Sequence, residues 1–395
     1  MSVAATGGQT SPSPAAAVAG RRRHVRQIDV LRVVAITLVV ADHVVGLILP
    51  ASHVGGALTI VLHSSRNLFF FMTGLVLMVS SGSADRRLSL WRFWRRRFPP
   101  ILLPYVVWTF IYWSGDSVGW GNTWPPSPSA GGLVRDLLLG WTQLYFLLVT
   151  MEFYVVFPLL AWLVRRLHHW HWLLIGCSLA CQLLWTGALG YWRGSFPMGV
   201  QGLLAHDDIV VFDYQLYFLL GTVVATRLDA VLAFMRRHAR GIVALALAGL
   251  LVTELGYLLN VVRFGMPPVG AAVEWQPAVV VGSLSVLALT AVVADRMLRG
   301  AAADSRRARA LARGADLSFG VFLSHVLVLF ILVQPAVRER LGLNELPAIV
   351  MALVTFLLTI LLSGMLSELM RRSPLSRLLT GRARRTGRRA LAPSS

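Results

Sequence analysis

Residues 28–50 read IDVLRVVAITLVVADHVVGLILP, and this stretch decides the fold. It is long enough to cross a bilayer, because about 20 apolar residues at about 1.5 Å per residue span about 30 Å of hydrocarbon. It also contains four groups that a simple anchor would avoid, namely Asp29, Arg32, Asp42 and His43. A charged side chain inside a membrane helix costs about 2.5–3.5 kcal/mol on insertion scales, so these groups require a partner, a hydrated cavity or a function.

Arg32 and His43 are spaced so that both leave the same face of a helix. Eleven residues make close to three turns, which gives an angular offset of about 20° and a separation of about 16 Å along the axis. A cation at one end of this face and a titratable imidazole further along it indicate an active channel. The alternative is a helix that docks in a polar bundle interior, and this span alone does not favour either reading.

The composition places the chain among polytopic membrane proteins. Of its 395 residues 56% are hydrophobic and only 14% charged, with mean hydropathy +0.66. A soluble protein would have about a quarter of its residues charged. All 37 basic residues are arginine, and they form short clusters between apolar blocks instead of a stripe with interleaved aromatics, so we expect no nucleic-acid partner.

We predict an all-α bundle of about ten transmembrane helices. Thirty of the 37 arginines fall before the first span, after even-numbered spans or after the last one, and only five fall on the other side. By the positive-inside rule both termini are cytoplasmic, in a multi-pass protein of the inner or plasma membrane. The predicted spans are 28–50, 57–81, 98–115, 142–164, 171–190, 209–226, 241–263, 277–298, 316–335 and 346–370.

Three segments follow from this pattern. Residues 1–20 are Ala, Gly, Ser and Pro without periodicity, which predicts a disordered amino-terminal tail. Residues 21–372 form the transmembrane domain. Residues 373–395 are predicted to form a basic cytoplasmic tail that contacts anionic membrane lipids.

Further polar groups lie at membrane depth in other spans. Glu152 and His325 both fall near the middle of the bilayer, and Arg66 lies in the outer half of the second span. Arg66 is most simply explained by a structural ion pair with Glu152 or Asp42. His325 by itself is more often a hydrogen-bonded core histidine than a catalyst. The set as a whole, two histidines with a carboxylate at similar depth, indicates acid–base chemistry.

A dense basic cluster precedes the third span, in the stretch WRFWRRRFPPILLPYVVW. Its arginines lie at the inner membrane face, on the same side as Arg32, where they could bind anions or could simply set the topology. The cluster consists of Arg92, Arg95, Arg96 and Arg97.

Five of these stretches, in order over residues 26–330, resemble the acyltransferase-3 family of integral membrane acyltransferases. The first span has the family's Arg, ten residues, His pattern at Arg32 and His43. The other stretches are the Phe-rich Thr-Gly helix FFFMTGLVL, the basic junction RRRFPPILLPYVVW, the fourth helix LYFLLVTMEFYVVFPLL and the late motif SFGVFLSH that ends at His325. Two positions depart from the pattern: Pro100 stands where the family often has a second arginine, and Gln143 where related members often have histidine.

The resemblance implies transfer of an acyl group, most often acetyl, from cytoplasmic acyl-coenzyme A to a hydroxyl of a saccharide, glycolipid or related acceptor. His43 would then be the catalytic base or carry the acyl group briefly. Asp42 or Glu152 would orient it, and His325 would assist proton transfer or position substrate. The coenzyme A phosphates would bind to Arg32, Arg92, Arg95, Arg96 and Arg97.

No metal is expected in this chemistry. The main alternative is a secondary transporter or flippase in which the same histidines and Glu152 relay protons. Consumption of labelled acetyl-coenzyme A by the purified protein would separate the two functions.

Overall fold

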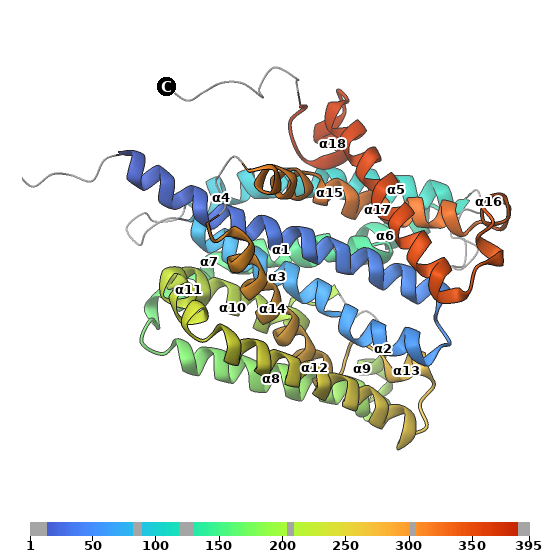
Figure 1. The fold of residues 1–395 in the computed structure, drawn as a ribbon, viewed down its shortest axis with the longest axis horizontal. Helices are drawn as coiled ribbons and strands as arrows, with labels where there is room; N and C mark the ends of the chain where they lie inside the picture. The colour runs from blue at the N-terminus through green and yellow to red at the C-terminus, as the bar shows by residue number, and fades with distance from the viewer. Residues whose placement is uncertain (1–13, 82–88, 118–128, 204–208, 301–304, 386–395) are drawn as a thin grey trace, which may run out of the picture.

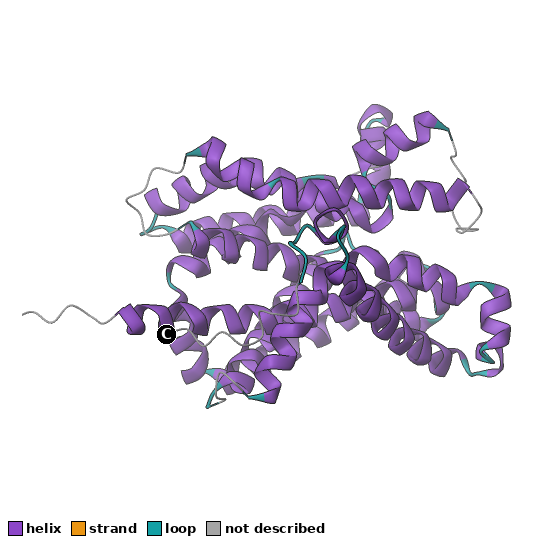
Figure 2. Ribbon diagram, turned by 90° about the horizontal axis from the view of Figure 1, so that it is seen from above, coloured by secondary structure: helices purple, strands orange, loops and turns teal. Residues whose placement is uncertain are grey.

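The computed structural model describes residues 14–81, 89–117, 129–203, 209–300 and 305–385. Every regular element within these ranges is a helix, and none is a strand (Figure 2). This confirms the predicted all-α class. The first helix, α1 (Pro14–Ile48), begins inside the segment 1–20 that we predicted to be disordered. A proline at the first position followed by an alanine-rich run favours helix there, and residues 1–13 lie outside the described ranges.

Eight helical segments in the described ranges are long and apolar enough to cross a membrane, so the chain is a multi-pass membrane protein. They include the second half of α1, the pair α2 (His53–Leu62) and α3 (Ser64–Ser80), and six further helices. The six are α7 (Tyr145–Arg166), α8 (His171–Tyr191), α12 (Ala239–Val262), α14 (Pro277–Leu298), α15 (Arg306–Val333) and α17 (Ala348–Arg372).

Two of the ten predicted spans are absent from these eight. The helix α5 (Pro99–Ser117) is 19 residues long, but its prolines and its Tyr and Trp residues lower its hydropathy. The helix α10 (Gln215–Thr226) is short, and the chain then bends by 95° into α11 (Leu228–Arg237). The bent pair counts as a ninth span if it is taken as one. The cytoplasmic location of the termini stays a prediction.

The remaining elements are short helices that connect or flank the long ones. They are α4 (Leu90–Arg97), α6 (Ala130–Leu139), η1 (Thr142–Leu144), η2 (Arg193–Ser195), α9 (Met198–Leu203), η4 (Val211–Tyr214), α13 (Pro268–Ala271), α16 (Pro335–Arg340), η5 (Leu343–Glu345) and α18 (Ser376–Thr380).

Helix α1 runs through the middle of the bundle. In Figure 1 it lies between a group that contains α5, α15, α17 and α18 and a group that contains α8, α10 and α12. Contacts join it to α3, α14, α15 and α17. The central position explains how one helix can expose polar groups to interior cavities while most of its surface packs against protein.

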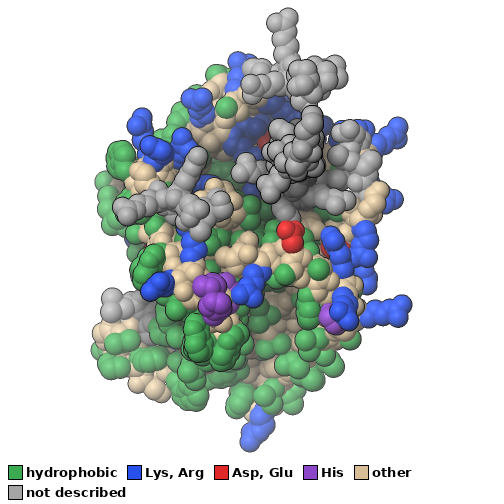
Figure 3. Space-filling model, turned by 90° about the vertical axis from the view of Figure 1, so that its left-hand side faces the viewer, with side chains coloured by type: hydrophobic (Ala, Val, Ile, Leu, Met, Phe, Trp, Pro, Cys, Tyr) green, Lys and Arg blue, Asp and Glu red, His purple; other side chains and the backbone are tan. Residues whose placement is uncertain are grey.

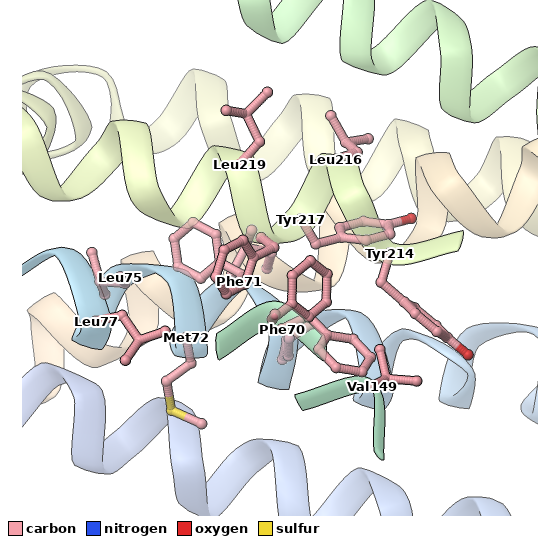
Figure 4. Packing of buried hydrophobic residues seen from close by; sticks show 14 of the residues in the cluster. Phe70, Phe71, Met72, Leu75, Leu77, Val149, Tyr214, Leu216, Tyr217 and Leu219 are labelled. Atoms are coloured by element: carbon pink, nitrogen blue, oxygen red, sulfur yellow. The ribbon is translucent and has the colours of Figure 1, made fainter. Parts of the chain in front are cut away.

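The buried side chains form two main clusters, one on each side of α1, α3 and α7. In the first, shown in Figure 4, Phe70 of α3 packs against Tyr214 with ring centroids 4.4 Å apart. In the second, the ring of Tyr112 on α5 stacks on Trp141, and its hydroxyl donates to the Leu323 carbonyl of α15 at 2.7 Å. The boundary between the two clusters, which we call the seam, contains the candidate site.

Close packing of α3 on α10 holds the first cluster together. A Cβ atom on Gly74 would collide with the Phe218 carbonyl oxygen, and one on Gly221 would collide with the Phe71 carbonyl oxygen. Small residues at both crossing points let the two backbones touch, as in many membrane helix pairs. The glycine of the Thr-Gly pair in the sequence therefore serves this crossing.

Candidate functional site

The seam contains two cavities at different depths along α1. The arginine cavity, of about 240 Å³, is lined by Arg32 of α1 and by Arg97 and Arg382, together with mostly apolar side chains of α3, α5, α7 and α15. Figure 3 shows that arginine side chains lie exposed over the left-hand end of the molecule as drawn in Figure 1. Among the described residues no carboxylate lines it, so its lining carries a net positive charge.

The histidine cavity, of about 200 Å³, lies further along α1. Asp42 and His43 of α1 line it, with Glu274 from the loop before α14. The other polar groups of its lining are His63, Ser65, Arg66, Gln143 and Tyr145. The spacing of Arg32 and His43 on one helical face thus places each residue in a different cavity of the same seam.

Three phenylalanines separate the two cavities and line both. They are Phe69 of α3, Phe146 of α7 and Phe322 of α15. The ring centroids lie 5.4 Å apart for Phe69 and Phe146, 5.4 Å for Phe146 and Phe322, and 6.5 Å for Phe69 and Phe322. We call this set the phenylalanine partition. These three are the residues that the two linings have in common.

His43 packs against His325, with ring centroids 5.1 Å apart. His325 is completely buried, and its Nδ1–H donates to the Phe322 carbonyl at 2.7 Å. Its Nε2 has no hydrogen-bond partner among the described residues, which leaves a lone pair available there. Because only His43 of the two lines the histidine cavity, His325 lies behind the ring that faces the cavity.

A charged network continues from His43 toward the loop before α14. The carboxylate of the neighbouring Asp42 lies 3.5 Å from His63 Nδ1, and His63 Nε2 lies 3.8 Å from Glu274. The Nε2–H of His63 also donates to the Ala272 carbonyl at 3.0 Å. Arg66 lies 3.4 Å from Glu274. The network therefore alternates carboxylates with two basic groups, and of these only the His63 imidazole is of a kind that exchanges protons near neutral pH.

Glu274 lies outside the membrane-spanning helices. Burial raises the pKa of its carboxyl group, but the positive charges of Arg66 and His63 outweigh burial and hold this pKa below its ordinary value. Glu274 is therefore ionised at neutral pH. Arg66 is also anchored by a hydrogen bond to the Tyr145 hydroxyl at 3.0 Å and lies over the Trp275 ring.

Gln143 faces the histidine cavity from a strained piece of backbone. The preceding residue, Thr142, has φ of +35°, a conformation that residues with a side chain rarely adopt. Gln143 is only 4% exposed; its Oε1 accepts from the Thr142 hydroxyl, while its Nε2 has no hydrogen-bond partner among the described residues. An unpaired buried donor in a cavity is costly without a ligand.

Glu152 does not join this site, and the interpretation that it forms the ion pair with Arg66 is wrong. Its carboxylate accepts a hydrogen bond from the Val211 backbone N–H at 3.0 Å, and it lines neither cavity. The hydrogen bond satisfies this carboxylate within the bundle, because η4 packs beside α7 and brings a backbone donor to it. The counter-ion of Arg66 is Glu274, and neither of the two carboxylates that we predicted takes that place.

The basic cluster before the third span divides into two kinds of residue. Arg97 lines the arginine cavity and donates to the Ser80 hydroxyl. Arg92, Arg95 and Arg96 are exposed on α4 and do not line the cavity. The two departures from the family pattern both lie at the site, since Pro100 lines the arginine cavity and Gln143 the histidine cavity.

Three site residues were missed at the sequence level, namely His63, Glu274 and Arg382. His63 could have been found, because it precedes Arg66 by one helical turn at the start of an apolar run. Glu274 and Arg382 lie in connecting segments that look like any interfacial loop. Within the described ranges no group of three or more His, Cys, Asp or Glu residues is arranged to hold a metal ion.

Comparison with known families identifies one match over nearly the whole chain. The family model Acyl_transf_3, described as an acyltransferase domain, matches residues 25–385. No curated protein and no solved structure matches the chain.

Proposed function

This chain belongs to the acyltransferase-3 family, and we propose that it transfers an acyl group from cytoplasmic acyl-coenzyme A to a hydroxyl of a saccharide or glycolipid. One observation carries the proposal: a cationic cavity and a histidine cavity lie in one seam, divided by the phenylalanine partition. In this proposal the acyl group is acetyl or of similar size, and the membrane is the inner or plasma membrane.

The arginine cavity suits the donor's phosphates. Coenzyme A carries several phosphate charges, and the arginine guanidinium binds phosphate with two parallel hydrogen bonds. The cavity has three arginines, Arg32, Arg97 and Arg382, and its lining has no carboxylate among the described residues. The narrow pantetheine arm would pass the three phenylalanine rings and bring the thioester to His43.

The chemical step follows from the groups around His43. Its imidazole takes the proton of the acceptor hydroxyl as the oxygen attacks the thioester carbonyl. The C–O bond forms, the C–S bond breaks, and the thiolate of coenzyme A leaves and takes up a proton. Transfer through an acyl group held briefly on His43 would use the same residues in two steps.

The carboxylates support this step through proton movement. Asp42 and Glu274 carry two negative charges against one on Arg66, so a proton on His63 between them makes the four groups neutral. The network can therefore hold the proton after its removal from the acceptor hydroxyl, until the coenzyme A thiolate takes it up. His325 keeps the His43 ring in place from behind.

Gln143 is suited to the tetrahedral intermediate. Its unpaired Nε2–H group lines the cavity that holds His43 and can donate to the oxygen on which negative charge develops. A donor that is fixed beforehand costs no reorganisation during the reaction, which fits the strained backbone at Thr142.

The test is incubation of the purified protein with acetyl-coenzyme A labelled in the acetyl group. An enzyme of this kind consumes the label and releases free coenzyme A when membrane glycolipids or saccharides of the source cell are added. Binding without any turnover, in the presence of the full membrane extract, would contradict the proposal. A transporter would neither bind nor consume the donor.

A further inference from the structure

The carboxyl-terminal segment folds back onto the bundle and forms one wall of the arginine cavity. Thr380, Gly381 and Arg382 all line it, although they follow the last membrane-spanning helix. Figure 1 shows α18 beside α17 and close to α5. We infer that this segment, residues 376–385, is a strap whose Arg382 binds a phosphate of the acyl-coenzyme A donor; the inference rests on the proposed function.

The strap is held in place by hydrogen bonds from two helices and by one within itself. The Trp108 indole N–H of α5 donates to the Leu379 carbonyl at 3.0 Å. On the other side, the Arg371 guanidinium of α17 donates to the Ala383 carbonyl at 2.6 Å. The Ser376 hydroxyl donates to the Arg382 carbonyl at 3.0 Å, so the strap also closes on itself. These bonds fix the backbone on both sides of Arg382.

Gly381 brings the strap against the entrance of the third predicted span. Its φ is +62°, the left-handed region, and a Cβ atom would collide with the Pro100 carbonyl oxygen. Only glycine satisfies both conditions without strain. The next residue is therefore turned inward toward the cavity.

The Arg382 guanidinium bonds to protein partners through only one of its three nitrogens among the described residues. Its Nη1 donates to the Asp316 carbonyl at 3.0 Å and to the Asp316 carboxylate. Among the described residues both bonds use Nη1, which leaves Nη2 and Nε for a ligand. Asp316 is shared, because Arg371 also lies 3.4 Å from it.

Two like charges meet at this wall of the cavity. The guanidinium groups of Arg32 and Arg382 both belong to residues that line this cavity. Their nearby carboxylates, Asp29 and Asp316, are not part of the cavity lining. Two cations that line one cavity favour binding of an anion there. A phosphate has enough acceptor oxygens to bind both guanidinium groups.

The experiment measures binding of coenzyme A to the full-length purified protein by calorimetry. Arg382→Gln should weaken binding by about 10- to 150-fold, the range for a lost hydrogen bond between charged groups. The matched control is Arg377→Gln, which removes the same charge from an exposed position of the strap outside the cavity. It should change binding by less than about twofold.

A second variant separates ligand binding from a merely structural ion pair. Asp316→Asn removes the carboxylate partner of Arg382 but keeps its guanidinium, so binding should be unchanged or tighter. Equal losses in Arg382→Gln and Asp316→Asn would overturn the inference, and so would unchanged binding in Arg382→Gln. If the wild-type protein binds coenzyme A, either of these outcomes overturns the role of Arg382 but not the proposed function. If the wild-type protein does not bind coenzyme A, both the role of Arg382 and the proposed function are overturned.

Discussion

The two cavities share a seam and three phenylalanines, yet their linings have opposite chemistry. The arginine cavity has only cations as charged groups among the described residues. The histidine cavity has two carboxylates, two histidines and one arginine within one lining. Fixed cations suit binding of an anion, whereas groups that exchange protons suit a chemical step.

This difference predicts that substitutions can impair donor binding and the chemical step separately. A change in one cavity should alter affinity, a change in the other should alter turnover, and a change in the partition should alter which donors pass. Five variants test this division, and the one expected to reduce activity most comes first.

His43→Ala should have the largest effect. A general base contributes about 10²- to 10⁴-fold to rate, so turnover should fall by that factor at any donor concentration. Donor binding should stay close to normal, because the phosphates bind in the other cavity. The measurement is the initial rate and coenzyme A affinity of the purified variant, with folding checked by size-exclusion chromatography. Near-normal turnover would mean that the Arg32–His43 face is structural.

Gln143→Leu should rank second. Loss of one donor to a developing oxyanion costs about 10²- to 10³-fold in kcat, with little change in KM. Gln143→Glu keeps the size but replaces the donor by an acceptor, and it should be at least as slow. Full kcat in the leucine variant would remove Gln143 from the mechanism.

Arg32→Ala should lower donor affinity by about 10- to 150-fold, with kcat partly recovered at high acyl-coenzyme A. Arg32→Lys should recover only part of the affinity, since a point charge replaces a planar fork. The control is Arg96→Ala on the exposed face of α4, which lies outside the cavity and should change affinity by less than about twofold. Equal losses in both variants would show that general positive charge, and not the cavity, attracts the donor.

Phe69→Leu should change selectivity more than rate. A wider partition should admit longer acyl groups, so the ratio of kcat/KM for acetyl- over butyryl-coenzyme A should fall by about tenfold. Phe319→Leu is the matched control, because Phe319 stacks on Phe322 but lines only the arginine cavity. The same shift in both variants would argue against a partition.

Glu152→Gln should have the smallest effect on turnover, within about threefold of wild type. Its carboxylate is bonded to the Val211 backbone and lies outside both cavities, and glutamine keeps an acceptor oxygen for that bond. Glu152→Leu removes the acceptor, leaves the Val211 N–H without a partner, and should lower the free energy of unfolding by about 1–3 kcal/mol. A large loss of kcat in a folded glutamine variant would bring Glu152 back into the mechanism.

The sequence alone was sufficient to predict the fold class, the family and the two residues, Arg32 and His43, that mark the two cavities of the site. A long apolar block forms a helix in lipid because a helix satisfies its backbone hydrogen bonds within the segment. The eleven-residue spacing is a property of the helix itself, so Arg32 and His43 share a face in any packing. Local pattern is sufficient for such features.

Only the tertiary structure decided which distant groups complete the two cavities. Glu152 and Glu274 are both isolated carboxylates in the sequence. In the structure Glu274 pairs with Arg66, whereas Glu152 accepts a hydrogen bond from the Val211 backbone N–H. Arg382 reaches the arginine cavity because Gly381 turns the chain against Pro100, 281 positions away in sequence. Partners of this kind depend on how segments far apart in the chain meet, and helical periodicity carries no information about that.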